Sequence, residues 1–117
     1  MKPLRVLIAD DEPITSQYLK ILLQRFPNLL LVGATTSGRD TLNFLHQHHL
    51  DLIFMDIQLP GMDGVEAAAR IRTLAAGTFI PIVAVTANAL PGDREAYLAA
   101  GMDDYLAKPI EPAQLQS

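Results

Sequence analysis

Residues 52–64 read LIFMDIQLPGMDG, an apolar run that stops at Asp56 and is followed by a turn rich in proline and glycine. A short apolar run bounded by turn residues is consistent with a strand buried on both faces of a parallel sheet. Ligands bind to open parallel sheets at the carboxyl ends of the strands. Asp56 therefore occupies a position where a functional carboxylate is expected.

Three further apolar runs also end at polar or charged residues. The residues at these ends are Asp10 with Asp11, then Thr86, and then Lys108. The carboxyl ends of parallel strands meet at one edge of a sheet, so these side chains are expected to gather with Asp56. The pattern predicts a site as well as a fold.

Strand-like runs alternate with helical patterns from one end of the chain to the other. The predicted strands are residues 4–9, 29–34, 51–55, 80–85 and 104–107. The predicted helices run from Pro13 toward Pro27, from Ser37 onward, and over 64–74, 93–100 and 111–117, the last unusually short. Right-handed crossovers then give an α/β fold with a doubly wound, five-stranded parallel sheet of the flavodoxin-like type. We expect strand order 2-1-3-4-5, five βα units, and a fifth helix that is short or truncated.

The bulk composition limits the classes of protein. The 117 residues suit a single domain, 1–117, and half of them are hydrophobic while 19% are charged. A net charge of −4 disfavours a basic face for nucleic acid. The chain has no cysteine, which excludes disulfides and cysteine metal sites. The apolar runs are too short for a signal sequence or a membrane span, so we expect a cytoplasmic protein.

The predicted strand ends bring acidic side chains close together. Asp10, Asp11 and Asp56 would repel one another unless a cation lay among them. A hard divalent ion such as Mg²⁺ takes carboxylate oxygens together with water and phosphate oxygens. With the Thr86 hydroxyl and the Lys108 ammonium group added, the set fits phosphoryl transfer to a carboxylate.

At these positions the chain resembles the receiver domains of response regulators in two-component and phosphorelay signalling. The matching residues are Asp10-Asp11, Asp56 with the LPGMDG turn at 59–64, Thr86-Ala87 and Lys108-Pro109. The stretches 83–90 and 101–109 also resemble receivers attached to hybrid histidine kinases. Met1 close to the first strand favours instead an N-terminal or free-standing receiver.

The resemblance implies a role for each matching residue. Asp56 is the expected phosphoacceptor, taking its phosphoryl group from a sensor histidine kinase or a histidine phosphotransfer protein. Asp11, Asp56 and the backbone carbonyl of Gln58 are the expected ligands of Mg²⁺ or Mn²⁺, and Asp10 acts through water. Thr86 and Lys108 are expected to contact phosphoryl oxygens.

Three of the residues that the resemblance singles out concern the response to phosphorylation. Tyr105 is expected to turn inward when Thr86 moves toward the phosphate. Gln58 and Asn88 flank the hydrolytic water in the family and are expected to set the lifetime of the phosphate. The implied output surface is the fourth helix, fifth strand and fifth helix, which is also the expected face of a homodimer. As a free-standing chain it would not be an enzyme beyond its own phosphorylation and dephosphorylation.

Simpler interpretations exist for each residue alone. Asp10 and Asp11 could cap the helix that begins at Pro13, and Asp56 could be an ordinary turn residue. His46 and His49 lie three residues apart, but at a helix end they suit the negative end of the dipole better than a metal. Asp51 is expected to be a polar residue that leads into a strand, and Asp103 and Asp104 are expected to be surface acids before the fifth strand.

The same residues distinguish this function from its alternatives. A receiver-like interaction module that signals without phosphorylation predicts the loss of a site residue, and none is missing. A flavin-binding sheet needs a Ser/Thr/Gly-rich phosphate loop where this chain has Asp10-Asp11-Glu12-Pro13. A haloacid-type phosphatase needs a second aspartate two residues after the first, where Glu12 stands.

Overall fold

Parallel strands alternate with helices along the chain, as the apolar pattern predicts. The computed structural model describes residues 2–57, 61, 64–74, 80–86, 95, 98–99 and 102–107, with the backbone alone at 64, 65, 74 and 105–107. The strands are β1 (Leu4–Ala9), β2 (Leu29–Thr35), β3 (Leu52–Asp56), β4 (Ile82–Thr86) and β5 (Asp104–Ala107). The helices are α1 (Pro13–Leu23), α2 (Gly38–Gln47) and α3 (Gly64–Leu74).

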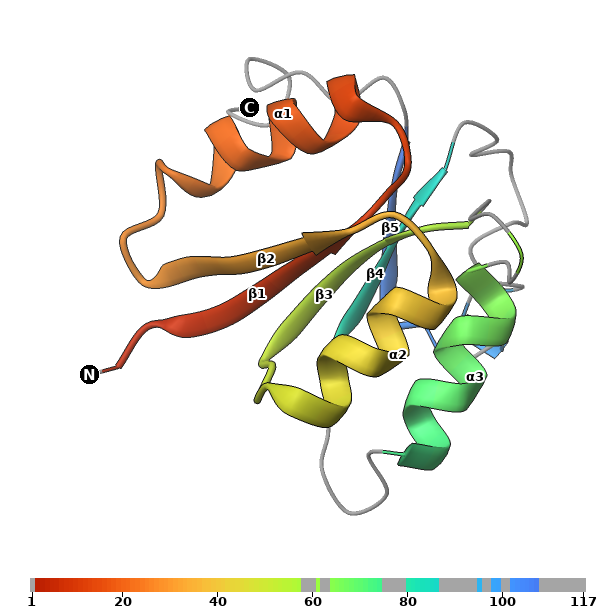
Figure 1. The fold of residues 1–117 in the computed structure, drawn as a ribbon. Coiled ribbons are helices and arrows are strands. Elements are labelled where there is room, and N and C mark those ends of the chain that lie inside the picture. The colour runs from red at the N-terminus through yellow and green to blue at the C-terminus, as the bar shows by residue number, and fades with distance from the viewer. Residues whose placement is uncertain are drawn as a thin grey trace.

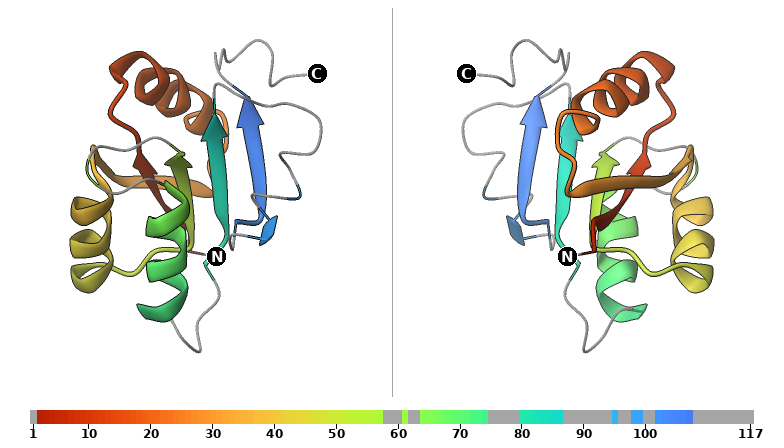
Figure 2. Two further views of the ribbon diagram at one scale, coloured as in Figure 1. Left: turned by 90° about the vertical axis from the view of Figure 1, so that its right-hand side faces the viewer. Right: turned by 90° about the vertical axis from the view of Figure 1, so that its left-hand side faces the viewer.

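All described strand pairs are parallel, and the sheet order is β2-β1-β3-β4-β5. Helix α1 covers one face of this sheet, whereas α2 and α3 lie side by side on the other (Figures 1 and 2). The predicted α/β class with a doubly wound parallel sheet is therefore confirmed. Most of the predicted helix at 93–100 and all of the one at 111–117 lie outside the described residues.

Successive side chains along each strand point to opposite faces of the sheet, and they form a separate hydrophobic core on each face. In β1, Val6 and Ile8 pack toward α1 with Leu19, while Leu7 packs with Ile71 of α3 on the other face. Strands β3 and β4 alternate in the same way, which is why their sequences are apolar up to the last residue of each strand. Two covered faces leave the ends of the strands as the place for polar side chains.

The apolar side of α1 differs from the prediction. The helical spacing of Ile14, Ile21 and Phe26 in the sequence predicts that they share an apolar side, but they are 62%, 38% and 45% exposed. The buried residues of this helix are Thr15, Leu19, Leu22 and Leu23. Apolar residues lie on both sides of the helix, so spacing alone does not identify the side that meets the sheet.

Helix α2 begins as predicted. The Ser37 hydroxyl accepts a hydrogen bond from the backbone N–H of Asp40 at 3.1 Å, which makes Ser37 the N-cap residue.

The register between β1 and β2 shifts by one residue near Gly33. Val6 pairs with Leu31, whereas the next residue, Leu7, pairs with Gly33. A Cβ atom at position 33 would lie only 2.6 Å from the ring of Phe44 in α2, so glycine permits the close approach of this ring.

Two of the acids expected merely to lead into strands hold the sheet together instead. Asp103 accepts hydrogen bonds from Arg72 of α3 and from the backbone N–H of Ile82, at 2.6 and 2.7 Å. Asp51 accepts one from the backbone N–H of Arg5 at 2.8 Å. Both acids are partly buried, which corrects the prediction that Asp103 is a surface residue.

Asp51 also makes the stability of the protein depend on pH. The hydrogen bond from the Arg5 N–H, supported by His49 at 2.9 Å, holds the pKa of Asp51 below its ordinary value of 3.8 against the opposing effect of burial. Because the pKa is lowered by folding, Asp51 binds a proton more readily in the unfolded chain than in the folded one. The charged form of Asp51 therefore stabilises the fold, and this stabilisation is complete above pH 3.8. It is lost as the pH falls through the lower pKa of the folded state.

We expect Asp51→Asn to lower the free energy of unfolding by about 1 kcal/mol at neutral pH, because the N–H of Arg5 loses a charged acceptor. Urea unfolding of both proteins over a series of pH values would measure this difference. The difference should shrink once the pH falls below the ordinary pKa of aspartate. A difference that is constant down to strongly acidic pH would show that the charge of Asp51 contributes nothing.

Candidate functional site

The strand register brings the predicted site residues to one edge of the sheet. Ala9, the last residue of β1, pairs with Met55, so Asp10 and Asp56 follow at equivalent positions on neighbouring strands. Asp56 pairs with Val85, which places Thr86 one residue further along β4. The three residues are 3%, 5% and 4% exposed, respectively. Their side chains are therefore held within the sheet edge and not spread over its surface.

Three carboxylates meet there. Asp10, Asp11 and Asp56 each offer an oxygen, and these oxygens all lie within 4.8 Å of one another. Asp10 and Asp56 are buried and Asp11 is exposed. Oxygen-only ligands of this kind suit hard cations such as Mg²⁺, with open positions for water and phosphate oxygens. The residues present therefore fit the metal that the sequence predicts.

Local hydrogen bonds fix the loop that carries two of these acids. The Asp10 Oδ1 atom accepts a hydrogen bond from the backbone N–H of Glu12 at 2.7 Å. The backbone N–H of Asp10 donates to the Thr35 carbonyl of β2 at 3.0 Å. Glu12 is the N-cap residue of α1 and accepts a hydrogen bond from the Thr15 hydroxyl. Asp10 and Asp11 are thus not the cap of this helix, which removes the simpler interpretation of the pair.

The other predicted residues are placed less completely. Tyr105 lies in β5 and its backbone pairs with Ala84, but its side chain is not described. Lys108, Gln58 and Asn88 lie outside the described residues. Their predicted roles stay predictions.

The histidines of α2 and its C-terminal end make contacts outside the carboxylate cluster. His49 hydrogen-bonds Asp51, the His48 ring stacks on Phe44 with centroids 4.2 Å apart, and His46 lines a groove between α2 and α3. These three residues form no metal cluster with other described residues.

Comparison with known proteins gives a consistent result. The profile of the response regulator receiver domain matches residues 6–117. The sensor histidine kinase GacS of Pseudomonas protegens is 41% identical over 114 residues, which are 95% of this chain and 12% of the kinase. The chain spans 7% of the length of a similar hybrid histidine kinase from Dictyostelium discoideum and 12% of the length of GacS.

Two solved structures show the same likeness. The receiver domain of the sensor histidine kinase PA1611 from Pseudomonas aeruginosa, with a magnesium ion in its active-site cleft, is 37% identical with a TM-score of 0.80. The match covers 97% of this chain and 92% of that one. A chain from the co-crystal structure of the Saccharomyces cerevisiae histidine phosphotransfer protein Ypd1 with the receiver domain of Ssk1 is 30% identical, with a TM-score of 0.82. That match covers 98% and 85% of the two chains.

Proposed function

The chain belongs to the response regulator receiver domain family, and on this premise we propose that it accepts a phosphoryl group on Asp56. We further propose that residues 1–117 form one domain of five βα units. The main support is the approach of the Asp10, Asp11 and Asp56 oxygens within 4.8 Å of one another at the strand ends. The Thr86 hydroxyl at the end of the adjacent strand adds a donor for a phosphoryl oxygen.

The proposed reaction is a phosphoryl transfer between side chains. An oxygen of the Asp56 carboxylate attacks the phosphorus of a phosphohistidine, and an O–P bond forms as the P–N bond breaks. The imidazole nitrogen keeps the electron pair of the broken bond and takes a proton from solvent. When bound by the carboxylates, Mg²⁺ or Mn²⁺ would neutralise charge on the phosphoryl oxygens.

Each remaining residue has a separate task in this proposal. Asp11 and Asp56, with the Gln58 carbonyl, would hold the metal directly, and Asp10 would act through water from the orientation that the Glu12 N–H fixes. Thr86 and Lys108 would donate to phosphoryl oxygens. A hydroxyl and an ammonium group suit this task, because charge on those oxygens is stabilised by donors placed in advance.

The consequences of phosphorylation belong to the same proposal. Movement of Thr86 toward the phosphate would be followed by Tyr105, and this would change the surface around β5. Gln58 and Asn88 would set the lifetime of the acyl phosphate.

The surface around β5 would also support a homodimer. We further propose that the domain acts in the cytoplasm. None of the described helices has the length and apolar character to span a bilayer.

The donor would be a sensor histidine kinase or a histidine phosphotransfer protein. Ypd1, a protein of the second kind, is the partner in one of the similar structures. The similarity to a short part of a sensor histidine kinase also makes a hybrid kinase the proposed parent of this domain. The domain alone would then be the acceptor within a relay and would have no kinase activity of its own.

The direct test is the intact mass after incubation with acetyl phosphate. The protein should gain one phosphoryl group with Mg²⁺ present, and it should gain none with EDTA or in Asp56→Asn. A gain that persists in the variant would place the acceptor elsewhere. The absence of any gain, in folded protein that binds Mg²⁺, would favour an interaction module that is not phosphorylated.

A second prediction concerns the docking of the phosphodonor protein. Ile14 is 62% exposed in the first turn of α1, three residues after Asp11. An exposed apolar side chain beside the site suits contact with a donor helix, so Ile14→Asp should slow transfer from a phosphotransfer protein about tenfold. Rapid-quench measurement of the phosphorylated fraction would give the rate.

Two controls separate docking from chemistry. Phosphorylation of Ile14→Asp by acetyl phosphate should be unchanged, because that donor needs no docking surface. Leu30→Asp alters an equally apolar residue, 45% exposed on the edge strand β2, and should transfer at the normal rate. Equal slowing by both variants would contradict a specific role for Ile14.

A further inference from the structure

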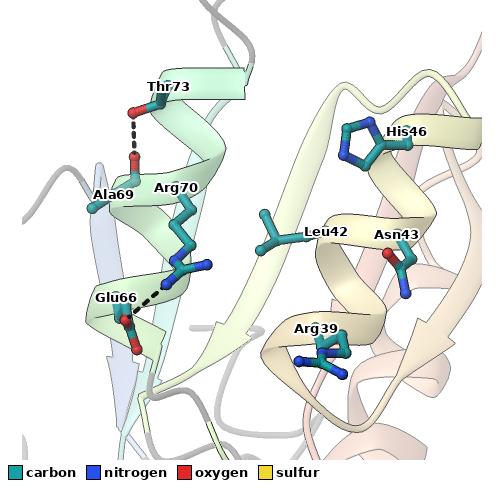
Figure 3. Close-up of a pocket in the computed structure, with 8 residues that line it drawn as sticks. All are labelled: Arg39, Leu42, Asn43, His46, Glu66, Ala69, Arg70 and Thr73. Atoms are coloured by element: carbon teal, nitrogen blue, oxygen red, sulfur yellow. Dashed lines mark hydrogen bonds and ion pairs between the residues drawn. The ribbon is translucent and has the colours of Figure 1, made fainter.

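A groove of about 600 Å³ lies between α2 and α3, away from the carboxylates at the strand ends. Both walls are helical. Arg39, Leu42 and Asn43 come from α2, and Glu66, Ala69 and Arg70 come from α3. Figure 3 shows the Arg70 side chain lying along α3 with its guanidinium group beside Glu66, and Leu42 pointing from α2 toward α3. A volume of this size is within the range of small-molecule sites in proteins.

The groove is positively charged in a protein that carries a net charge of −4. Two guanidinium groups and one carboxylate line it, which leaves a single net positive charge when His46 is neutral. Arg39 forms no hydrogen bond or ion pair with any other described residue. Its five N–H donors are thus available to a ligand.

Arg70 is only loosely engaged. It donates to Glu66 at 3.3 Å, and the two side chains are 57% and 51% exposed. An exposed ion pair one helical turn apart contributes little to the stability of a protein. An incoming carboxylate can therefore share the Arg70 guanidinium, which has a planar set of donors suited to two oxygens.

An apolar surface lies between the charged groups. Leu42 is half-buried and packs against the core on one side, while its position in the wall exposes the rest of it to the groove. Ala69 of α3 also lines the groove, and its small side chain leaves room for a ligand. The Asn43 amide adds a polar group that, like Arg39, has no partner among the described residues.

We propose that this groove binds a small organic monocarboxylate. The carboxylate lies between Arg39 and Arg70, and the aliphatic or aromatic part of the ligand lies along Leu42 and Ala69. A monoanion matches the single net positive charge, whereas a phosphate dianion would also meet the carboxylate of Glu66. This inference stands apart from phosphorylation, since it uses none of the strand-end residues.

Hexanoate is a suitable probe, with hexanamide as its uncharged match. Titration followed by amide NMR shifts should give saturable changes at residues 38–47 and 64–74, with a dissociation constant in the millimolar range. Hexanamide should bind about tenfold more weakly, because it lacks the charge-assisted hydrogen bonds. Arg39→Gln and Arg70→Gln should each weaken hexanoate by about the same factor.

Further variants decide between outcomes. Arg25→Gln removes an exposed arginine outside the groove and should leave the affinity unchanged, as should Asp56→Asn. Equal binding of hexanoate and hexanamide would overturn the assignment of a carboxylate site. Saturable shifts that persist in the double arginine variant, or that occur only outside α2 and α3, would overturn it as well. Because Asp56→Asn is not phosphorylated, hexanoate binding by that variant separates this inference from the proposed function.

Discussion

Asp56→Asn should melt at a higher temperature than the unsubstituted protein in buffer free of divalent cations, although it should take up no phosphoryl group. Asp10 and Asp56 are almost fully buried, and their oxygens and that of Asp11 lie within 4.8 Å of one another. Like charges this close raise the free energy of the folded state. Removing one of them should stabilise the fold by about 1 kcal/mol, or about 5 °C in melting temperature.

Mg²⁺ should reverse the order of the two proteins. A ligand that binds only the folded state stabilises it by about 1.4 kcal/mol at ten times its dissociation constant. The unsubstituted protein should gain this stabilisation, whereas the variant has lost one carboxylate of the cluster and should gain little. Differential scanning calorimetry with EDTA and with increasing Mg²⁺ would measure both effects.

Glu95→Gln is the matched control for this experiment. It removes one negative charge at an exposed position, and Glu95 is not among the carboxylates of the cluster. It should change neither the melting temperature without metal nor the response to Mg²⁺. If Asp56→Asn melted lower than the unsubstituted protein and both responded equally to Mg²⁺, the carboxylates would not act as one cation site.

The sequence contains most of what decides the site. Asp10 directly follows β1 and Asp56 ends β3, and the apolar pattern of both strands is unambiguous, so the parallel register alone brings these two residues to equivalent positions. Thr86 is placed by the same reasoning. Helix α3 and strands β1 and β5 have the predicted bounds for a similar reason, because turn residues mark both ends of each apolar segment.

The predictions that were wrong share one physical cause, which is that they depend on tertiary contacts. Ile14 is apolar and exposed because contact with the sheet, and not apolar character, decides which side of α1 is buried. The local sequence predicts that Asp103 is a surface acid, because its partners, Arg72 and the N–H of Ile82, are 31 and 21 residues away in the chain. Residue type and local spacing carry no information about such pairs. The groove between α2 and α3 is likewise a product of packing, with no motif to mark it.

Asp103→Ala should be among the most destabilising single substitutions outside the core, with a loss of about 3 kcal/mol in the free energy of unfolding. The Asp103 carboxylate accepts hydrogen bonds from Arg72 of α3 at 2.6 Å and from the N–H of Ile82 in β4 at 2.7 Å. Arg72 also donates to the Ile80 carbonyl at 2.5 Å, so one partly buried ion pair ties α3 to the start of two strands. Without the carboxylate, a guanidinium and a strand N–H lose their acceptor in a site that is only partly open to water.

A double-mutant cycle separates the ion pair from the bond to the strand. Arg72→Leu and Asp103→Ala together should cost less than the sum of the two, with a coupling of about 1 to 2 kcal/mol from urea unfolding. Asp104→Ala, the exposed neighbouring acid, should cost less than about 0.5 kcal/mol. Additive losses would mean that Asp103 acts through Ile82 alone, and a loss at Asp104 as large as that at Asp103 would remove any special role for the pair. This network lies at the end of the sheet opposite the carboxylates. Asp103→Ala should therefore still take up one phosphoryl group at temperatures where it remains folded. Such a result would show that the substitution affects the stability of the fold and not the phosphorylation reaction.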